Sequence, residues 1–185
     1  MSRIPSAILT EDSAFGLFAF GLAREIPEWV EAKWPGPVLD LGPGTKQIPE
    51  ADRLDYPEHD FDDPDYRLPY EDGEVSGIFA INVLEHLNDP RRIIAEAARV
   101  LGAGCPLTVF VPHARSGMYL QDLDHKTPFI LDTWKNHVEP HPYYEKGREG
   151  ITGLFEVGFN ALFAIKEENV CILTQLIRTE EPYPW

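Results

Sequence analysis

A short apolar run that ends in a glycine turn, VLDLGPG at residues 38–44, constrains this chain more than any other feature. The run is bounded by proline and glycine on both sides, which is typical of a strand buried in a parallel sheet. Gly42 and Gly44 can adopt backbone angles closed to other residues and so let a ligand approach the main chain. In doubly wound α/β folds, ligands bind at the carboxyl ends of such strands. We therefore expect a ligand site directly after Leu41.

An acidic residue ends the next strand-like run, residues 53–55. Asp55 at that position could accept hydrogen bonds from both hydroxyls of a ribose. The glycine turn alone would be weak evidence, since a tight turn can follow any buried strand. Together, the turn and the acid predict a site for a nucleoside cofactor.

Residues 68–90 continue the pattern with a turn at 71–73, an apolar strand near 75–81 and a polar residue, Asn82, at its end. A helix should follow, because Asp89 is a suitable N-cap and Pro90 suits the first helical position. Gly102 or Gly104 would end this helix. A further strand near 107–111 then stops at Pro112-His113. The order of strand, helix and strand predicts parallel pairing.

Ordered motifs in this chain resemble the class I S-adenosylmethionine-dependent methyltransferases, in particular the small methyltransferase-domain family that is called type 11-like. The resemblance covers roughly residues 36–136, and its strength lies in the order of the motifs. The motifs are DLGPG (40–44), Asp55, LPYEDGEVSGIFAINVLEHL (68–87), RVLGAG (99–104), VPH (111–113) and DLDHKTPFILDTW (122–134). It implies S-adenosylmethionine as the cofactor.

The resemblance also implies a role for each matching residue. Asp40, Gly42 and Gly44 would line the methionine part of the cofactor, and Asp55 would hold the ribose hydroxyls. Asp60 and the backbone amide of Phe61 would contact adenine. Asn82 would lie beside the methionine amino group and the sulfonium, with Glu85 and His86 at the mouth of the pocket.

Two departures from the family pattern concern the cofactor side. Thr45-Lys46-Gln47 follows Gly44 where family members often have a third glycine. Only about a dozen residues separate the first two strands, which is near the minimum for a parallel crossover. The first crossover helix is therefore expected to be short or absent.

Three histidines lie where the carboxyl edge of the sheet is expected, and we take His86, His113 and His125 as candidate catalytic residues. A base is useful when an alcohol or amine accepts a methyl group, although correct positioning supplies much of the acceleration. Structural hydrogen bonding is the alternative role for each histidine. Asp122 and Asp124 could bind a divalent metal with His113 and His125, but their spacing matches no established pattern, so no metal ligand is assigned.

Composition narrows the class of protein. The chain has 185 residues and carries 31 acidic against 16 basic residues, for a net charge of −15, so nucleic-acid binding is disfavoured. Cys105 and Cys171 show no metal-binding spacing and suggest a reducing, intracellular setting, where both would be small buried side chains. No signal peptide or membrane-spanning run is evident, so we expect a cytoplasmic protein.

The predicted fold class is α/β, with a doubly wound, mainly parallel, seven-stranded-type Rossmann-like sheet. Residues 154–166 and 169–179 should form an antiparallel hairpin at its C-terminal edge, whereas His137 and His141 lie among prolines and suggest a loop. Residues 1–185 should form a single domain. Its parts are an N-terminal helical cap (1–35), a cofactor-binding core (36–112), a substrate-side insertion (113–150) and C-terminal strands (151–185).

The most direct functional hypothesis is a methyltransferase that transfers the cofactor's methyl group to an oxygen or nitrogen atom of a small or medium-sized acceptor. The alternative is a catalytically silent member of the fold that serves as a regulatory or scaffold subunit. A third hypothesis is that the same cofactor supports different chemistry, because fold does not fix reaction. The sequence is also compatible with a homodimer. The chain lacks the Asn/Asp-Pro-Pro-aromatic sequence of amino-directed DNA methyltransferases, the Pro-Cys nucleophile of cytosine C5 enzymes and the third glycine of dinucleotide-binding loops.

Overall fold

The computed structural model describes residues 35–45, 48, 50–138, 151–166 and 169–180. The predicted N-terminal helices and His141 lie outside the described residues. The described chain forms one mixed sheet with the strand order β2-β1-β3-β4-β6-β5. Its strands are β1 (Val38–Leu41), β2 (Asp52–Leu54), β3 (Gly77–Ile81), β4 (Pro106–Pro112), β5 (Phe155–Lys166) and β6 (Asn169–Arg178).

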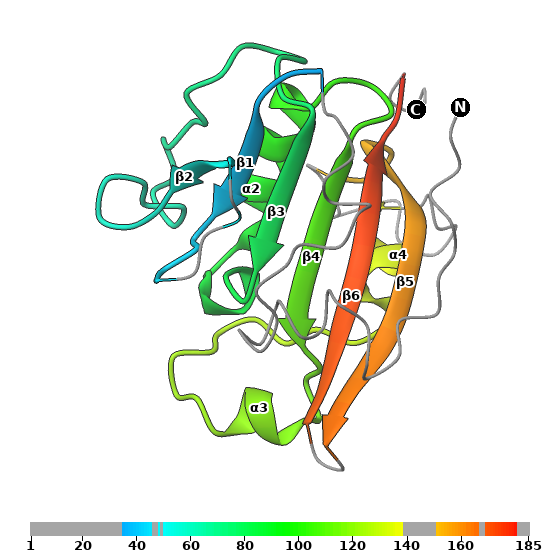
Figure 1. Ribbon diagram of the computed structural model, residues 1–185. Coiled ribbons are helices and arrows are strands. Elements are labelled where there is room, and N and C mark those ends of the chain that lie inside the picture. The colour runs from blue at the N-terminus through cyan, green and yellow to red at the C-terminus, as the bar shows by residue number, and fades with distance from the viewer. Residues whose placement is uncertain (1–34, 46–47, 49, 139–150, 167–168, 181–185) are drawn as a thin grey trace.

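The four strands β2, β1, β3 and β4 pair in parallel, whereas β6 runs antiparallel to both β4 and β5. This arrangement confirms the predicted Rossmann-like sheet with an antiparallel C-terminal hairpin, and the described residues contain six of its strands. The strands β1, β3 and β4 point toward one edge of the sheet, near α3 (Gly117–Leu120) (Figure 1). Polar residues that follow these strands are therefore brought to the same edge.

The central strands are apolar because both faces of the sheet are covered there. All seven residues of β4 are buried, as are four of the five in β3. Behind the sheet lies α2 (Pro90–Val100), which buries Ile93, Ile94, Ala97, Ala98 and Val100 (Figure 1). Near-continuous apolar strands are expected in a parallel sheet that is buried on both faces.

The start of α2 agrees with the prediction, since the Asp89 side chain accepts from the Arg91 N–H and Pro90 is the first helical residue. The predicted glycine end agrees in position only, since Gly102 directly follows the C-cap residue but does not have a positive φ. The helix ends at Val100, and Leu101 is an extended C-cap residue whose N–H donates to the Ala97 carbonyl. Leu101 leaves the helix early because it forms a parallel bridge with Val75, and Gly102 extends this pairing by donating to the Val75 carbonyl.

Two of the three parallel crossovers contain no helix among the described residues, namely those from β1 to β2 and from β2 to β3. The expectation of a short or absent first crossover helix is confirmed for that part of the chain. The second crossover is instead tied to α2 by Arg99. Its guanidinium donates to the Leu68 and Tyr70 carbonyls at 2.9 Å and pairs with Glu96 and Asp72.

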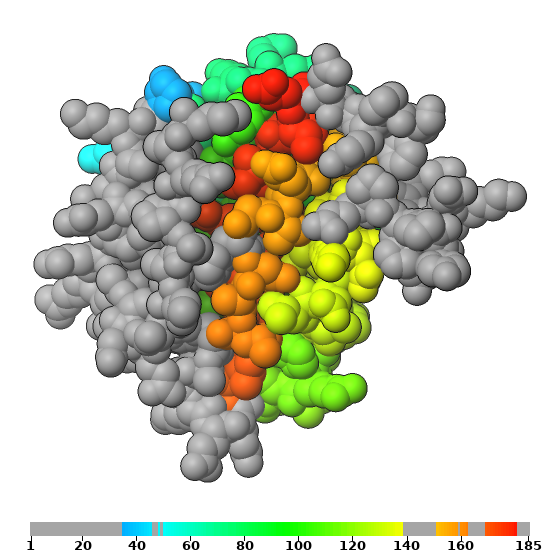
Figure 2. All heavy atoms as spheres, turned by 90° about the vertical axis from the view of Figure 1, so that its right-hand side faces the viewer, coloured from blue at the N-terminus to red at the C-terminus, as the bar shows by residue number. Residues whose placement is uncertain are grey.

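The C-terminal hairpin forms the lateral side of the sheet opposite β2, and a short helix packs beside it. Strand β5 pairs with β6, and α4 (Asp132–Val138) packs beside β5 (Figure 2). His137 belongs to this helix, so the prediction that it lies in a loop is wrong. Trp134 explains the helix, because burying its ring, which stacks on Phe129 at 5.3 Å, outweighs the neighbouring proline signals. In the described parts of the chain, no helix has the length and apolar character needed to cross a membrane.

Candidate functional site

The glycine turn after β1 is closed by backbone contacts. Gly42 has φ +61° and donates its N–H to the Leu54 carbonyl at 2.8 Å, which ties the turn to the end of β2. A Cβ atom on Gly42 would lie 2.5 Å from a methyl carbon of Val83, so no other residue fits without a shift. Gly44 also has a positive φ, +56°, but a Cβ there would meet no described atom within 4 Å. The predicted left-handed conformations are confirmed, and open space adjoins the turn at Gly44.

Asp55 follows the last residue of β2 and faces this turn. Its carboxylate accepts from the Gly44 N–H at 3.0 Å, from the Tyr56 N–H at 3.0 Å and from the Arg53 guanidinium at 2.8 Å. The side chain is still 20% exposed, so its carboxylate edge is accessible to a ligand. The carboxylate therefore lies beside the glycine turn, the position that the sequence predicted for a ribose-binding acid.

Asp40 lies within β1 and is 2% exposed. Its carboxylate accepts from the Ile48 N–H at 2.7 Å, so it shapes the loop that follows the glycine turn. Burial raises the pKa of Asp40 from 3.8 to about 6; the Ile48 N–H opposes this rise and the charge of Asp55 adds to it. A buried carboxylate with this much desolvation favours a cationic group nearby.

The residues predicted to contact adenine differ in their surroundings. Asp60 is exposed and accepts from the Asp62 N–H, whereas the Phe61 ring is buried and packs edge-on against Tyr66 at 5.5 Å. The adjacent Asp62 accepts from both nitrogen donors of Asn88 and pairs with Lys126 at 3.0 Å. Asp62 thus holds this loop against the histidine-bearing segment, a role that the sequence alone did not indicate.

Asn82 directly follows β3 and has φ +52°. This conformation is uncommon outside glycine, and asparagine tolerates it better than most residues do. The backbone N–H of Asn82 donates to the Phe110 carbonyl at 2.8 Å, which keeps the residue in register with β4. Next along the chain, Val83 contacts the Gly42 position. Asn82 is therefore placed at the carboxyl edge close to the glycine turn.

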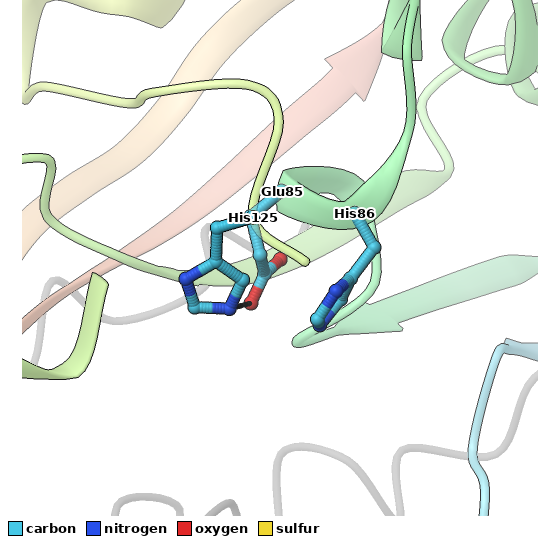
Figure 3. Close-up of side chains that lie close together, drawn as sticks. All are labelled: Glu85, His86 and His125. Carbon is cyan, nitrogen blue, oxygen red and sulfur yellow. Dashed lines mark ion pairs between the residues drawn. The ribbon is translucent and has the colours of Figure 1, made fainter. Parts of the chain in front are cut away.

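Two of the three predicted histidines converge with a glutamate. Glu85 and His86 come from η1 (Leu84–His86), and His125 approaches from the loop after α3 (Figure 3). A ligand atom of each side chain lies within 4.8 Å of the others. Glu85 Oε1 is 4.0 Å from His125 Nε2, and the two imidazole rings are 4.7 Å apart.

Backbone contacts bring these distant segments together. The Glu85 carbonyl accepts from the N–H groups of Lys126 and Thr127 at 2.7 and 3.0 Å, and the Thr127 hydroxyl donates to the Leu87 carbonyl. His125 is further held by Tyr119, whose carbonyl lies 2.9 Å from His125 Nδ1 and whose ring stacks on the imidazole at 5.2 Å. The cluster is thus built by residues about 40 positions apart in sequence.

Glu85 is an unusual member of this cluster because its side chain is 1% exposed. Its Oε2 atom has no hydrogen-bond partner among the described residues. Burial raises the pKa of Glu85 from 4.5 to about 8; its own backbone N–H lowers the pKa, and the negative charge of Asp122 adds to the rise. The sequence placed Glu85 at the mouth of a pocket but carried no sign that its carboxylate is buried.

Of the remaining candidates, only Asp122 adjoins this cluster. His113 directly follows β4, its Nδ1 accepts from the Arg115 N–H at 3.1 Å, and its backbone bridges to Phe129. Asp122 lies 3.7 Å from His125 Nε2, but Asp124 is exposed and donates its N–H to Asp122. The four residues considered from sequence as a metal set are therefore not brought together as one group.

The two cysteines behave as ordinary side chains of the fold. Cys171 on β6 is fully buried, and burial raises the pKa of its thiol to about 12. Cys105 is half-buried, and desolvation raises its pKa as well. The negative charge of Glu85 adds to the rise for Cys171, and raised pKa values make both thiols poor nucleophiles.

The strand order and the parallel central strands define a Rossmann-like fold. Within it, residues 40–108 match the family model described as "Methyltransferase domain". The predicted resemblance to the class I methyltransferases is confirmed for this part of the chain, which is similar to that family over residues 40–108. No curated protein matches the sequence.

Solved structures show the same fold at low sequence identity. One chain of a complex that contains the Haloferax volcanii Trm112 methyltransferase activator is 15% identical, with a TM-score of 0.51, over 83% of this chain and 88% of that one. The [4+2]-cyclase SpnF is 13% identical, with a TM-score of 0.52, over 78% and 76%. The YcgJ protein from Bacillus subtilis is also 13% identical, with a TM-score of 0.52, over 91% and 99%. At these identities the likeness concerns the fold.

Proposed function

We propose that this protein binds S-adenosylmethionine at the glycine turn and transfers the methyl group to an oxygen or nitrogen atom of a small or medium-sized acceptor. The observation that carries the proposal is the junction of Gly44 and Asp55, where the carboxylate meets the turn and open space adjoins it. The methyltransferase-domain match over residues 40–108 supports it.

The proposal assigns a residue to each part of the cofactor. Asp55 would accept from the ribose hydroxyls, with Asp60 and the Phe61 amide on the adenine side. The cofactor has two cationic groups, an ammonium and a sulfonium, and the buried Asp40 carboxylate would favour both electrostatically. Asn82 would lie on the methionine side, where its unusual backbone conformation directs the chain past Gly42.

The methyl group of the bound cofactor is electrophilic because it is attached to a sulfonium. In the proposed step the bond from carbon to sulfur breaks as the acceptor's lone pair forms a bond to carbon, and the acceptor releases a proton. Glu85, His86 and His125 would lie on the acceptor side and could orient the acceptor and take part in the loss of that proton. His113 is less suited to this role, since its Nδ1 accepts a hydrogen bond from the Arg115 N–H.

Calorimetric titration tests the proposal directly. S-Adenosylmethionine and S-adenosylhomocysteine should bind with micromolar dissociation constants, about −8 kcal/mol, while NAD and ATP at the same concentrations give no signal. Absence of binding at every reachable concentration, or preference for NAD, would contradict it. The Asp124→Ala variant should bind S-adenosylmethionine as the unmodified protein does, because this exposed acid lies away from the glycine turn.

A second candidate function is a regulatory or scaffold subunit that performs no methyl transfer. The two crossovers without described helices favour it, because they reduce the structure around the cofactor side. The neighbours also permit it, since one comes from a complex with a methyltransferase activator and another is named a cyclase. Binding of the cofactor without formation of S-adenosylhomocysteine, across a panel of alcohol and amine acceptors, would favour this second function.

A further inference from the structure

The cluster of Glu85, His86 and His125 contains a buried acceptor atom, Glu85 Oε2, for which the described residues supply no donor. The His125 Nδ1 lies 2.9 Å from the Tyr119 carbonyl oxygen, which can only accept. Nδ1 therefore carries the proton, and in the neutral ring Nε2 carries the lone pair. That lone pair faces Glu85 Oε1 at 4.0 Å and Asp122 Oδ2 at 3.7 Å. Three acceptors thus face a common space.

A shared proton does not account for this arrangement. A hydrogen bond between a carboxyl oxygen and an imidazole nitrogen requires a separation of about 2.7–3.2 Å, which is shorter than both contacts to His125 Nε2. Glu85 Oε2 is also buried without a partner among the described residues. A buried oxygen in this condition is destabilising, and a cation held between Glu85, His86 and His125 would give it a partner.

We propose that Glu85, His86 and His125 bind a divalent transition-metal ion, with Asp122 as a fourth, more exposed ligand. Ligand bonds of about 2.0–2.2 Å place two atoms on one ion up to about 4.4 Å apart. The observed separations, all within 4.8 Å, close onto an ion with small side-chain adjustments. Figure 3 shows the glutamate and both imidazoles directed toward one region from two segments of the chain.

The ligand chemistry selects the class of ion. Two imidazole nitrogens with one or two carboxylates suit zinc, iron, cobalt, nickel or manganese, whereas magnesium and calcium prefer oxygen ligands alone. The Tyr119 carbonyl completes the pattern, because metal-binding histidines usually donate their second ring N–H to a backbone carbonyl or carboxylate. This contact fixes both the tautomer and the ring orientation of His125.

An ion held by three or four protein ligands keeps coordination positions for a small molecule. The acceptor's oxygen could occupy such a position, and a bound hydroxyl loses its proton more easily there. This assignment to the acceptor rests on the proposed function, whereas the metal site itself does not. Metal titration and cofactor titration are separate measurements, so failure of one proposal is distinguishable from failure of the other.

Cobalt(II) is the probe for the test, because its visible absorption reports coordination. Protein without an affinity tag is treated with EDTA, dialysed and titrated with Co²⁺, with zinc binding followed by calorimetry. We expect one ion per chain, with micromolar or tighter affinity, and no competition from an excess of Mg²⁺. Absence of 1:1 binding overturns the site, and displacement of Co²⁺ by equimolar Mg²⁺ overturns the proposed class of ion.

Two variants and one control locate the ion. Glu85→Gln and His86→Asn should each weaken Co²⁺ binding by at least about tenfold. His59→Asn removes a histidine outside the cluster, one that contacts Tyr66 at 2.8 Å, and should leave the affinity unchanged. Unchanged affinity in either cluster variant, or equal loss in the control, overturns the assignment. His86 is half-buried, so His86→Asn decides the question even if Glu85→Gln does not fold, as circular dichroism would show.

Discussion

At the carboxyl end of the sheet, the glycine-turn side (Asp40, Gly42, Gly44 and Asp55) and the histidine side (Glu85, His86 and His125) are built in opposite ways. On the glycine-turn side, Asp40 and Asp55 accept from backbone N–H groups only 8 and 11 residues away. On the histidine side, Glu85 meets His125 through contacts between segments about 40 residues apart, and one buried oxygen has no partner in the described part of the chain. Short-range hydrogen bonds thus organise the first half, whereas the second depends on tertiary packing.

This difference predicts that substitutions on the two sides affect different properties of the protein. The described residues of the glycine-turn side are held in their conformation by the protein's own hydrogen bonds, which would lower the entropic cost of binding the proposed cofactor. On the histidine side, backbone hydrogen bonds hold the segments together, but burial raises the pKa of Glu85. Such perturbed pKa values are typical of functional sites. Substitutions on the first side should therefore act through stability and cofactor affinity, and those on the second through turnover and metal binding.

The strongest test of this comparison is Gly42→Ala set against Gly44→Ala. Both positions have positive φ, but only the Gly42 Cβ would collide with Val83. We expect Gly42→Ala to lower the free energy of unfolding by about 4 kcal/mol, the sum of backbone strain and overpacking, and Gly44→Ala by about 1 kcal/mol. Urea denaturation followed by circular dichroism measures both. Equal losses would show that the turn is not tightly packed.

The next test uses the pH dependence of stability. Asp40 has a folded pKa of about 6 against 3.8 for the free group, so between these values the folded state binds more protons than the unfolded state. Its contribution to stability is present below pH 4 and is lost as the pH rises to about 6. Relative to Asp40→Asn, the wild type should lose about 3 kcal/mol over that window. Parallel stability curves for the two proteins would contradict the pKa shift.

The histidines separate turnover from binding. His125→Ala should slow methyl transfer by about 100-fold while leaving the cofactor's dissociation constant unchanged, because His125 lies on the acceptor side. His113→Ala should cause a much smaller loss, since that ring contacts the Arg115 backbone. Steady-state kinetics and cofactor titration measure the two effects. A larger loss for His113→Ala, or loss of cofactor affinity in His125→Ala, would break the division of the edge.

The smallest expected effect concerns the cofactor alone. Asp55→Ala removes the carboxylate assigned to the ribose hydroxyls and should weaken cofactor binding by about 2 kcal/mol, roughly 30-fold. Asp60→Ala, at an exposed position, should cost less. Calorimetry gives both values, and turnover at saturating cofactor should change little. Unchanged affinity in Asp55→Ala would refute the assignment.

Much of the glycine-turn side, the start of α2 and the C-terminal hairpin could be predicted because their determinants are local. The positive φ values of Gly42 and Gly44, the Asp89 cap and the antiparallel C-terminal hairpin follow from short sequence patterns. The early end of α2 could not be predicted, because the bridge between Val75 and Leu101 decides it. His137 joined a helix for a similar reason, since the burial of Trp134 outweighed local signals.

By itself, the amino-acid sequence determined the class of fold and the place of the glycine turn, because strand periodicity, glycine conformation and capping act over a few residues. Tertiary structure alone decided that Glu85 is buried, that it meets His86 and His125, and that His113 stands apart. Those outcomes depend on how the segment around Lys126 and Thr127 docks on η1. Burial and electrostatic coupling arise only when such distant segments pack, so no local pattern records them.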